Sequence, residues 1–185
     1  MKTLIFDGSP HPKGDTATLI RALTENLNGE YNIIRAYDER NISPCLDCRY
    51  CWQHPVCAMQ DGMTRVYRLI QECDAIVIAS PLYYSELTGT LLAMLSRLQL
   101  FYCANRFQGI RLIEKEKKGG ILLTGGGMGG PSNAIKTAKI LLRAMGAQDI
   151  AEEVMSLRTD SLPARQDPDA LQAARKLGQI LSEKK

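Results

Sequence analysis

Short apolar runs alternate with amphipathic helical patterns along the whole sequence, and this alternation constrains the fold more than any other feature. The apolar runs that predict strands span residues 4–6, 31–35, 75–79, 121–124 and 150–154. The patterns that predict helices span residues 16–27, 63–73, 90–102, 134–145 and 167–181. Five alternating units predict the α/β class, a parallel sheet with helices on both faces. A chain of 185 residues without repeats or linkers suits a single domain, expected to span residues 1–185.

Two helix boundaries carry clear local signals. Asp167 followed by Pro168 combines a preferred N-cap with proline at the first helical position, so a helix is predicted to begin there. Gly146 is placed to end the preceding helix, because glycine readily adopts the left-handed conformation found after helices.

Parallel sheets of this kind bind ligands at the carboxyl ends of their strands. For the strand order 2-1-3-4-5 the site lies between the first and third strands, where the order reverses. The loops after the first, third and fourth predicted strands would all open on that edge. Each of the three contains residues suited to a ligand.

The loop after the first predicted strand, residues 8–18, has the composition of an anion-binding turn. It leads into a helix N-terminus, where unpaired N–H groups and the helix dipole favour a phosphate. Its hydroxyl groups and its cation come from Ser9, Thr16, Thr18 and Lys13. The alternative is an ordinary connection with Asp15 as the N-cap. The turn is not a Walker A motif, because Gly14 is followed by Asp15 and not by lysine.

The loop after the third predicted strand contains two consecutive tyrosines. Pro81 fixes the backbone, and Tyr83 and Tyr84 offer flat faces and hydroxyls that can flank a planar, partly polar ring. The alternative is that both tyrosines pack beneath the loop. A phosphate turn with an aromatic slot beside it indicates flavin mononucleotide, FMN.

The loop after the fourth predicted strand, residues 124–131, is rich in glycine. Gly125, Gly127 and Gly130 match the pattern G-x-G-x-x-G, but a dinucleotide fingerprint normally opens the first strand–helix unit and not the fourth. We interpret the loop as backbone that lets a flavin or nicotinamide ring approach closely. The alternative is a flexible surface loop.

Four cysteines stand close together between the second strand and the second helix, with the spacing C-x2-C-x2-C-x5-C. They are Cys45, Cys48, Cys51 and Cys57. The first three have the spacing with which loops wrap a [4Fe–4S] cluster, and a later cysteine often completes the set. Zinc is an alternative, with His54 able to replace one ligand, and so are free thiols or a reversible disulfide. Cys73 and Cys103 lie in helical apolar stripes and are interpreted as core residues.

Composition excludes several functional classes. The net charge of +3 is spread along the chain, and residues 115–118 are interpreted as a solvated turn, so we expect no nucleic-acid partner. The apolar windows are of strand length and Asp7 comes too early for a signal-peptide core, so we expect a cytoplasmic protein without a membrane span. The third predicted strand ends in Ser80-Pro81 with no aspartate, which argues against a phosphorelay domain.

Together, the three loops and the cysteine run resemble the flavodoxin-like NAD(P)H-dependent FMN reductases, in particular the branch that contains the iron–sulfur flavoproteins. The matching residues are Gly8-Ser9-Pro10, Gly14, Thr16-Ala17, Ser80-Pro81-Leu82-Tyr83-Tyr84, Gly89, Pro44-Cys45, Cys48, Cys51, Cys57 and Asp61-Gly62-Met63. The resemblance implies a flavodoxin-like three-layer sandwich with a five-stranded sheet of order 2-1-3-4-5. It also implies bound FMN, reduction by NADH or NADPH, and a homodimer or homotetramer. The family usually has a basic residue in place of His11 and an asparagine in place of Asp15, and an aspartate at the phosphate adds like-charge repulsion.

These observations predict an FMN-dependent oxidoreductase that passes electrons from NAD(P)H to a quinone, flavin, nitroaromatic or metal acceptor. The residues expected to bind FMN are Ser9, His11, Lys13, Gly14, Asp15, Thr16, Ala17, Thr18, Pro81, Leu82, Tyr83, Tyr84, Ser85, Thr124, Gly125, Gly126 and Gly127. Backbone N–H groups of residues 82–85 are expected to stabilise the reduced flavin, and no catalytic side chain is assigned. The alternative functions are an electron carrier with FMN, a [4Fe–4S] cluster and a ferredoxin-type partner, or a zinc-stabilised binding module.

Overall fold

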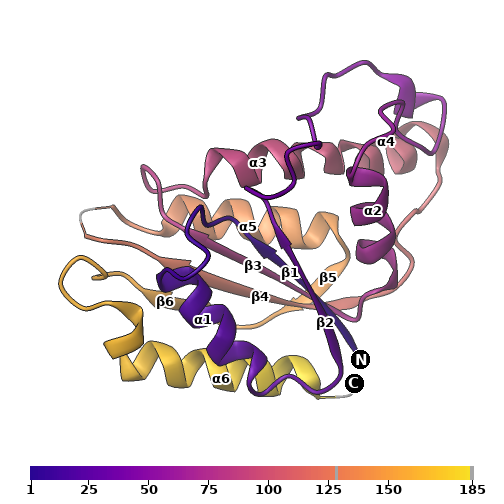
Figure 1. Ribbon diagram of the computed structural model, residues 1–185. Coiled ribbons are helices and arrows are strands. Elements are labelled where there is room, and N and C mark those ends of the chain that lie inside the picture. The colour runs from indigo at the N-terminus through magenta and orange to yellow at the C-terminus, as the bar shows by residue number, and fades with distance from the viewer. Residues whose placement is uncertain (128, 184–185) are drawn as a thin grey trace.

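The computed structural model describes residues 1–127 and 129–183, which form one parallel sheet with helices on both faces (Figure 1). The strands are β1 (Lys2–Asp7), β2 (Glu30–Arg35), β3 (Ala75–Pro81), β4 (Lys117–Thr124), β5 (Ala147–Ile150) and β6 (Val154–Ser156). The α-helices are α1 (Asp15–Thr24), α2 (Met63–Glu72), α3 (Gly89–Leu95), α4 (Gln99–Gln108), α5 (Ser132–Ala144) and α6 (Pro168–Ser182). Three short 3-10 turns complete the set: η1 (Tyr50–Trp52), η2 (Ser96–Leu98) and η3 (Ala164–Gln166).

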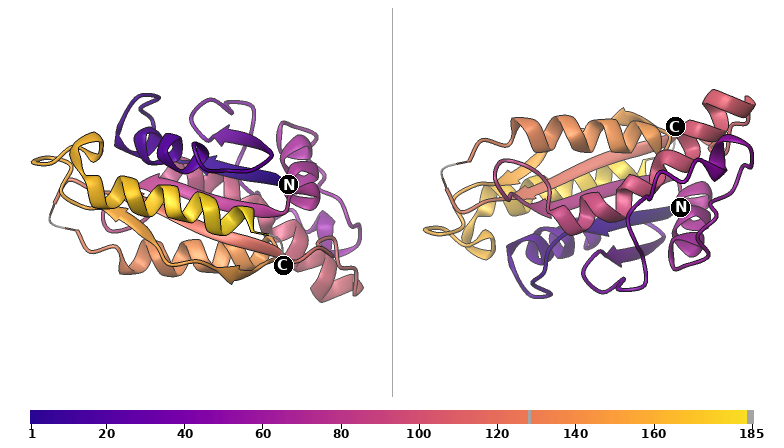
Figure 2. Two further views of the ribbon diagram at one scale, coloured as in Figure 1. Left: turned by 90° about the horizontal axis from the view of Figure 1, so that it is seen from below. Right: turned by 90° about the horizontal axis from the view of Figure 1, so that it is seen from above.

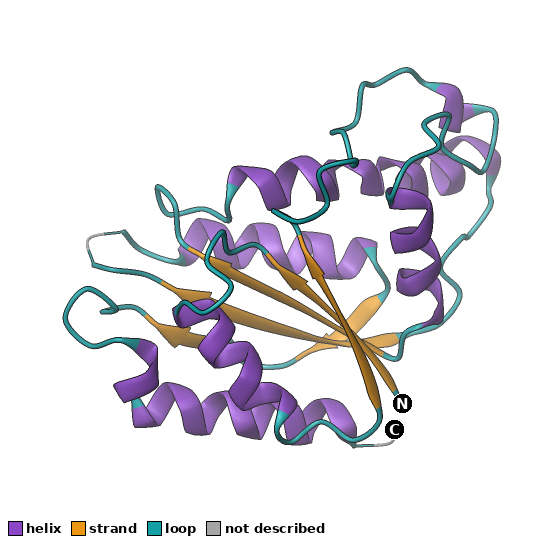
Figure 3. Cartoon of the chain, in the orientation of Figure 1, coloured by secondary structure: helices purple, strands orange, loops and turns teal. Residues whose placement is uncertain are grey.

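The strand order is β2-β1-β3-β4-β5, and β6 also pairs with β4. The fold class and the predicted order 2-1-3-4-5 are therefore confirmed. The strand order reverses between β1 and β3, which is where ligands of such sheets bind. These two strands are parallel neighbours, so their carboxyl ends lie side by side. Helical and extended segments alternate along most of the chain as the sequence pattern predicted, except that β5 is followed directly by β6 (Figure 3).

The three-layer arrangement follows from strand periodicity, since successive side chains of a strand point to opposite faces. Ile5, Val77 and their neighbours pack against α1 and α6. Phe6, Ile78 and their neighbours pack against α2, α3, α4 and α5. Figure 2 shows α1 and α6 in front of the sheet from one side and α3 and α5 from the other. The central strands are buried on both faces, which explains their continuous apolar runs.

The fifth strand differs from the prediction of residues 150–154. Two short strands in succession, β5 and β6, pair with the amino-terminal and carboxyl-terminal halves of β4, respectively. Ala151 follows β5 directly, and its N–H donates to the carbonyl of Gly119 at 3.0 Å before the chain moves on to β6. The predicted strand therefore covers the connection between the two real ones. The sequence pattern therefore predicted a strand in the correct part of the chain but gave it the wrong bounds.

The third helix is also not continuous. Residues 90–102 were predicted as one helix, whereas the structure has α3, the 3-10 turn η2 and then α4, which continues to Gln108. At the break, the Ser96 hydroxyl donates to the carbonyl of Ala93 at 2.6 Å. A 3-10 stretch inside a helical run often marks a hinge or a strained segment. Here it presents Ser96 and Arg97 to the cysteine segment, as described below.

Residues 115–118 are not simply a solvated turn. Lys117 and Lys118 begin β4, and Lys117 is buried. The Lys117 ammonium donates to the carbonyl of Lys115 at 2.8 Å, and burial lowers the pKa of Lys117. The Lys118 ammonium donates to the carbonyl of Ile180 at 2.6 Å. Composition suggested exposure, but Lys117 and Lys118 pair with the neighbouring strands and therefore belong to the sheet.

Among the described residues, no helix combines the length and the apolar character that a membrane crossing requires.

Candidate functional site

The three predicted ligand loops meet at the carboxyl edge of the sheet, on the left of Figure 1. The Thr16 hydroxyl lies 2.8 Å from the Thr124 hydroxyl and joins the phosphate turn to the end of β4. The Thr88 hydroxyl donates to the carbonyl of Gly8 at 2.7 Å and joins the tyrosine loop to the same turn. The Leu82 N–H donates to the carbonyl of Thr124 at 2.8 Å. The loops thus form one connected surface.

The N-terminus of α1 is open to an anion. Gly14 is the N-cap, and no side chain caps the helix. Within the described residues, the backbone N–H groups of Asp15, Thr16 and Ala17 have no hydrogen-bond acceptor, whereas that of Thr18 donates to the carbonyl of Gly14. Three free N–H groups and the positive end of the helix dipole are suited to a phosphate. His11 and Lys13 are exposed beside them.

Asp15 has a different role from the N-cap considered as the alternative for this turn. It is the first helical residue, and its carboxylate accepts a hydrogen bond from the Ala164 N–H at 2.7 Å. The N-cap interpretation is therefore wrong. The carboxylate is held by η3, a segment from the other end of the sequence, so its charge is engaged there.

Asp7 is a structural residue of the turn that the sequence did not single out. It is 3% exposed, its carboxylate accepts from the Ser9 N–H at 2.8 Å, and Arg35 donates to it at 3.2 Å. Burial raises the pKa of Asp7 despite these two favourable partners. The His11 N–H donates to the Ser9 hydroxyl at 3.1 Å, which fixes the next step of the turn. The turn is therefore held in shape before any ligand binds.

The tyrosine loop is a tight hairpin. Tyr83 and Glu86 exchange both backbone hydrogen bonds, at 2.9 and 3.1 Å. The two residues between them, Tyr84 and Ser85, have φ angles of 52° and 64°. Left-handed backbone costs a residue other than glycine about 1–2 kcal/mol, and such strain gathers at functional sites. The hairpin is anchored because the Thr137 hydroxyl donates to the Glu86 carboxylate at 2.8 Å.

The two tyrosines are not packed beneath the loop. Tyr83 is 45% exposed and Tyr84 is fully exposed, so the alternative interpretation of this loop is wrong. Tyr84 lines a cavity of about 420 Å³, and its other walls are Leu82, Ser85, Gly125, Gly126, Gly127 and Gly129. The N–H groups of Leu82 and Tyr83 are already engaged in the hydrogen bonds described above. Of the N–H groups of residues 82–85, those of Tyr84 and Ser85 therefore remain for a ring.

The glycine loop lies beside the segment that follows β6. The Gly125 N–H donates to the carbonyl of Ser156, and the Thr159 N–H donates to the carbonyl of Gly125, both at 2.9 Å. A side chain at Gly126 would collide with the Asp160 carboxylate. Met128 of this loop lies outside the described residues. The first part of the loop therefore packs closely against residues 156–160.

The cysteine segment, residues 45–57, lies apart from these loops, above α4 at the upper right of Figure 1. The Cys45 N–H donates to the Ser96 hydroxyl at 2.9 Å, and the Gln108 amide donates to the carbonyl of Cys51 at 2.9 Å. The ring of Trp52 stacks on Phe107 with centroids 4.3 Å apart. These contacts fasten the segment to α4 and to the turn before it.

The backbone of this segment is strained between its cysteines. Asp47 and Arg49 have φ angles of 48° and 61°, and neither is glycine. Two left-handed residues turn the chain tightly. A tight turn of this kind is needed if successive cysteines are to face the same side. All four predicted metal ligands line one small cavity together with Arg97: Cys45, Cys48, Cys51 and Cys57. The six cysteines of the chain are free thiols.

Cys103 belongs to the same cavity, which sequence reasoning missed. It is buried as a core residue, yet it lines the cavity beside Cys51. Burial and then Cys103 raise the pKa of Cys51. Cys73, in contrast, donates to the carbonyl of Ile70 at 3.3 Å and behaves as the predicted core residue.

The four cysteines that line this cavity are the donor set of a [4Fe–4S] cluster or of zinc. In residues 1–127 and 129–183, no three Cys, His, Asp or Glu side chains converge closely enough to hold one metal ion. The ring of His54 stacks on Tyr50, with centroids 4.2 Å apart.

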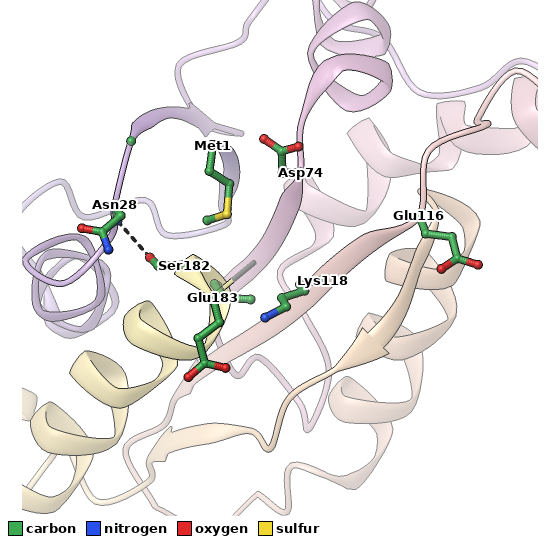
Figure 4. A pocket seen from close by; sticks show the side chains of 9 residues that line it. Met1, Asn28, Asp74, Glu116, Lys118, Ser182 and Glu183 are labelled. Carbon is green, nitrogen blue, oxygen red and sulfur yellow. Dashed lines mark hydrogen bonds between the residues drawn. The ribbon is translucent and has the colours of Figure 1, made fainter. Parts of the chain in front are cut away.

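A larger cavity, of about 720 Å³, lies at the opposite end of the sheet (Figure 4). Met1, Asp74 and Lys118 surround it near the amino ends of the strands, and the Asn28 N–H donates to the Ser182 hydroxyl across one wall at 2.9 Å. Ligands of open parallel sheets bind at the carboxyl ends. We therefore assign the functional site to the carboxyl edge despite the smaller cavity there.

The sheet order and the loops at its carboxyl edge define a flavodoxin-like α/β domain. Residues 1–160 match the model of the NADPH-dependent FMN reductase family, and the chain belongs to that family. The family resemblance expected from the sequence is thus confirmed.

The individual relatives described next share low sequence identity with this chain. An iron-sulfur flavoprotein of Archaeoglobus fulgidus is 25% identical over 99% of this chain and 80% of its own length. An iron-sulfur flavoprotein of Methanocaldococcus jannaschii is 28% identical over 65% of this chain, and the match spans only 65% of that relative. The solved NAD(P)H:quinone oxidoreductase of Methanothermobacter marburgensis superposes with a TM-score of 0.79 at 18% identity, covering 100% of this chain and 98% of that one. That structural likeness supports the fold.

Proposed function

We propose that the protein binds FMN at the carboxyl edge of its sheet and uses NAD(P)H to reduce a quinone, a flavin or a similar small acceptor. The observation that carries the proposal is the open N-terminus of α1 beside the strained tyrosine hairpin. One end of the site offers three free N–H groups, and the other offers exposed aromatic and glycine-lined surface. A phosphate at one end and a flat ring at the other match the two ends of FMN.

The residues of the chain have distinct tasks in this proposal. The N–H groups of Asp15, Thr16 and Ala17 hold the phosphate, with Lys13 near enough in sequence to add a positive charge. Bound FMN supplies the hydride-accepting chemistry. The exposed ring of Tyr84 flanks the flavin and excludes water from one side. Backbone N–H groups of Tyr84 and Ser85 are placed to bond the ring where negative charge develops on reduction.

The runner-up function is electron transfer by FMN and a [4Fe–4S] cluster held by Cys45, Cys48, Cys51 and Cys57. Support comes from the single cavity that these cysteines share and from relatives named iron-sulfur flavoproteins. In that case a ferredoxin-type protein would be the electron donor. The two functions are compatible in one molecule, and they differ in whether NAD(P)H reduces the protein directly.

The deciding experiment is a visible absorption spectrum of the protein purified without air, before and after addition of NADPH. Two flavin bands that bleach with NADPH support the reductase, and a broad additional brown absorbance with bound iron and sulfide supports the cluster. Rapid reduction by ferredoxin without oxidation of NADH or NADPH would favour the carrier. A colourless protein that takes up no added FMN would refute the flavin site.

We also propose that the chain assembles as a homodimer or homotetramer, as in the sequence-based expectation. Light scattering on the FMN-loaded protein measures the mass directly against the 20.5 kDa of one chain.

A further inference from the structure

Arg97 is a buried cation at the wall of the cysteine cavity, and neither the motif nor the fold explains it. It lies in η2, it is 2% exposed, and it lines the cavity. Among the fully buried side chains of the described residues, Arg97 is the largest by residue volume. A buried arginine requires anions or carbonyl groups around it, because an uncompensated buried charge is costly.

The hydrogen bonds of Arg97 reach both ends of the cysteine segment. Its guanidinium donates to the carbonyl of Ser43 at 3.0 Å, before Cys45, and to the carbonyl of Met59 at 3.3 Å, after Cys57. The Asp61 carboxylate accepts from it at 2.7 Å and 3.3 Å. Arg97 therefore closes the segment into a loop, with Asp61 as its counter-charge.

One further hydrogen bond points to a role beyond closing the loop. The guanidinium donates to the Cys57 sulfur at 3.3 Å. The Nε of Arg97 is buried and has no partner within residues 1–127 and 129–183. An unsatisfied donor is unfavourable in a buried site. The Cys57 hydrogen bond places a guanidinium N–H donor against one of the sulfurs that line the cavity.

We infer that Arg97 is a positioning residue that raises the reduction potential of a [4Fe–4S] cluster bound by Cys45, Cys48, Cys51 and Cys57. The inference rests on the cluster of the proposed function. A hydrogen bond to a ligand sulfur withdraws electron density from it, and a nearby positive charge favours the more negative, reduced cluster. One electron from a reductant such as dithionite then enters the cluster at a higher potential than it would without Arg97.

The experiment compares Arg97→Gln with Asp61→Asn in protein reconstituted with iron and sulfide without air. Iron and labile sulfide per chain are measured first, and a dye-mediated redox titration followed by electron paramagnetic resonance then gives the cluster potential. Arg97→Gln removes the charge, so its potential is expected to fall. The ratio of reduced to oxidised cluster at the wild-type midpoint should fall at least tenfold, which equals about 59 mV for a one-electron couple.

Asp61→Asn is the matched control, because it breaks the same loop closure while leaving Arg97 unneutralised. Its potential is expected to rise. A role limited to holding the loop would shift both variants in the same direction, and that result would overturn the inference. Loaded variants with the wild-type potential would also overturn it.

Arg97→Lys protects the test against misfolding, since it keeps the charge but loses the planar set of donors. Its potential should lie between those of wild type and Arg97→Gln. If Arg97→Gln fails to bind a cluster, a lowered potential in Arg97→Lys supports the inference and an unchanged one refutes it. A wild-type protein that binds no cluster would refute the cluster proposal itself, whereas a loaded wild type with unshifted variants refutes only the role of Arg97.

Discussion

The carboxyl edge of the sheet and the cysteine segment are both candidate redox sites, but the molecule holds them in different ways. The edge loops continue from β1, β3 and β4, whose residues are buried and bonded on both sides. The cysteine segment follows the edge strand β2 and rests on side chains of η2 and of the end of α4. The sheet topology therefore brings the loops of the first site together, and side-chain hydrogen bonds such as that between Thr16 and Thr124 hold them there. A few specific side chains position the second, so single substitutions should affect the two sites independently.

The largest expected effect is on the carboxyl edge. Thr16→Glu places a carboxylate at the open end of α1, and two like charges about 4 Å apart repel by about 4 kcal/mol at the effective dielectric of a protein surface. FMN should therefore bind at least about 100-fold more weakly, as measured by titration of flavin fluorescence. Iron binding by the cysteine segment should be unchanged.

Thr16→Ser is the control for this prediction, because it keeps the hydroxyl that meets Thr124 and should retain FMN. Thermal melts of both variants show whether the buried position tolerates the change. A folded Thr16→Glu protein as yellow as the wild type would show that the phosphate binds elsewhere.

The converse test removes a cysteine. Cys48→Ser should lose most of the iron that the wild type binds on reconstitution, because Cys48 lines the cavity. FMN affinity should not change. Cys73→Ser is the matched control, since Cys73 lies in the core and bonds Ile70, and it should keep its iron. Equal iron in the two variants would mean that Cys48 is not a ligand.

Two glycines test how tightly the carboxyl edge is packed. A Cβ at Gly8 would lie 2.8 Å from the Leu91 side chain and 3.0 Å from the hydroxyls of Ser80 and Thr88. Gly8→Ala should therefore destabilise the fold by about 1–3 kcal/mol in urea unfolding. Gly89 begins α3 and has open space around it, so Gly89→Ala should be neutral or stabilising by up to about 1 kcal/mol. Similar losses in both variants would contradict the close packing at Gly8.

The smallest expected effect is a pH dependence confined to the cysteine segment. Burial pushes the pKa of Asp61 up, but hydrogen bonds from Arg97 and from the Met63 N–H outweigh it and the pKa is lowered. A carboxyl with a lowered pKa stabilises the fold above its unfolded pKa of about 3.9, and this contribution is lost as the pH falls through the folded value. Below about pH 4 the segment should therefore loosen.

Trp52 reports this change directly, because it is the single tryptophan and it stacks on Phe107. Its fluorescence should change on acidification at a higher pH than the far-ultraviolet circular dichroism of the sheet. Asp61→Asn cannot titrate, so its fluorescence should show little dependence over that range. If fluorescence and circular dichroism of the wild type change at the same pH, the cysteine segment and the sheet unfold together and the prediction is wrong.

Much of the fold was predictable because its signals are local. The start of α6 is one example, since the Asp167 carboxylate accepts from the Ala170 N–H at 3.1 Å as an N-cap should. Gly146 ends α5 with a φ of 93°, as predicted. The parallel sheet and its ligand-binding edge followed from the alternation of elements, and the strand order followed from the resemblance to the FMN reductases. The bounds of the fifth strand and the break at Ser96 did not, because both depend on partners elsewhere in the chain.

The sequence by itself determined the fold class, the edge where the loops gather and the run of four cysteines, because periodicity, caps and spacing act over a few residues. Only the tertiary structure brought together Asp15 and Ala164, which are 149 residues apart, and Arg97 and Cys57, which are 40 apart. Neither pair leaves a local pattern. Buried polar groups must find partners wherever the topology places them, so the residues that hold each site in shape became visible only in the folded chain.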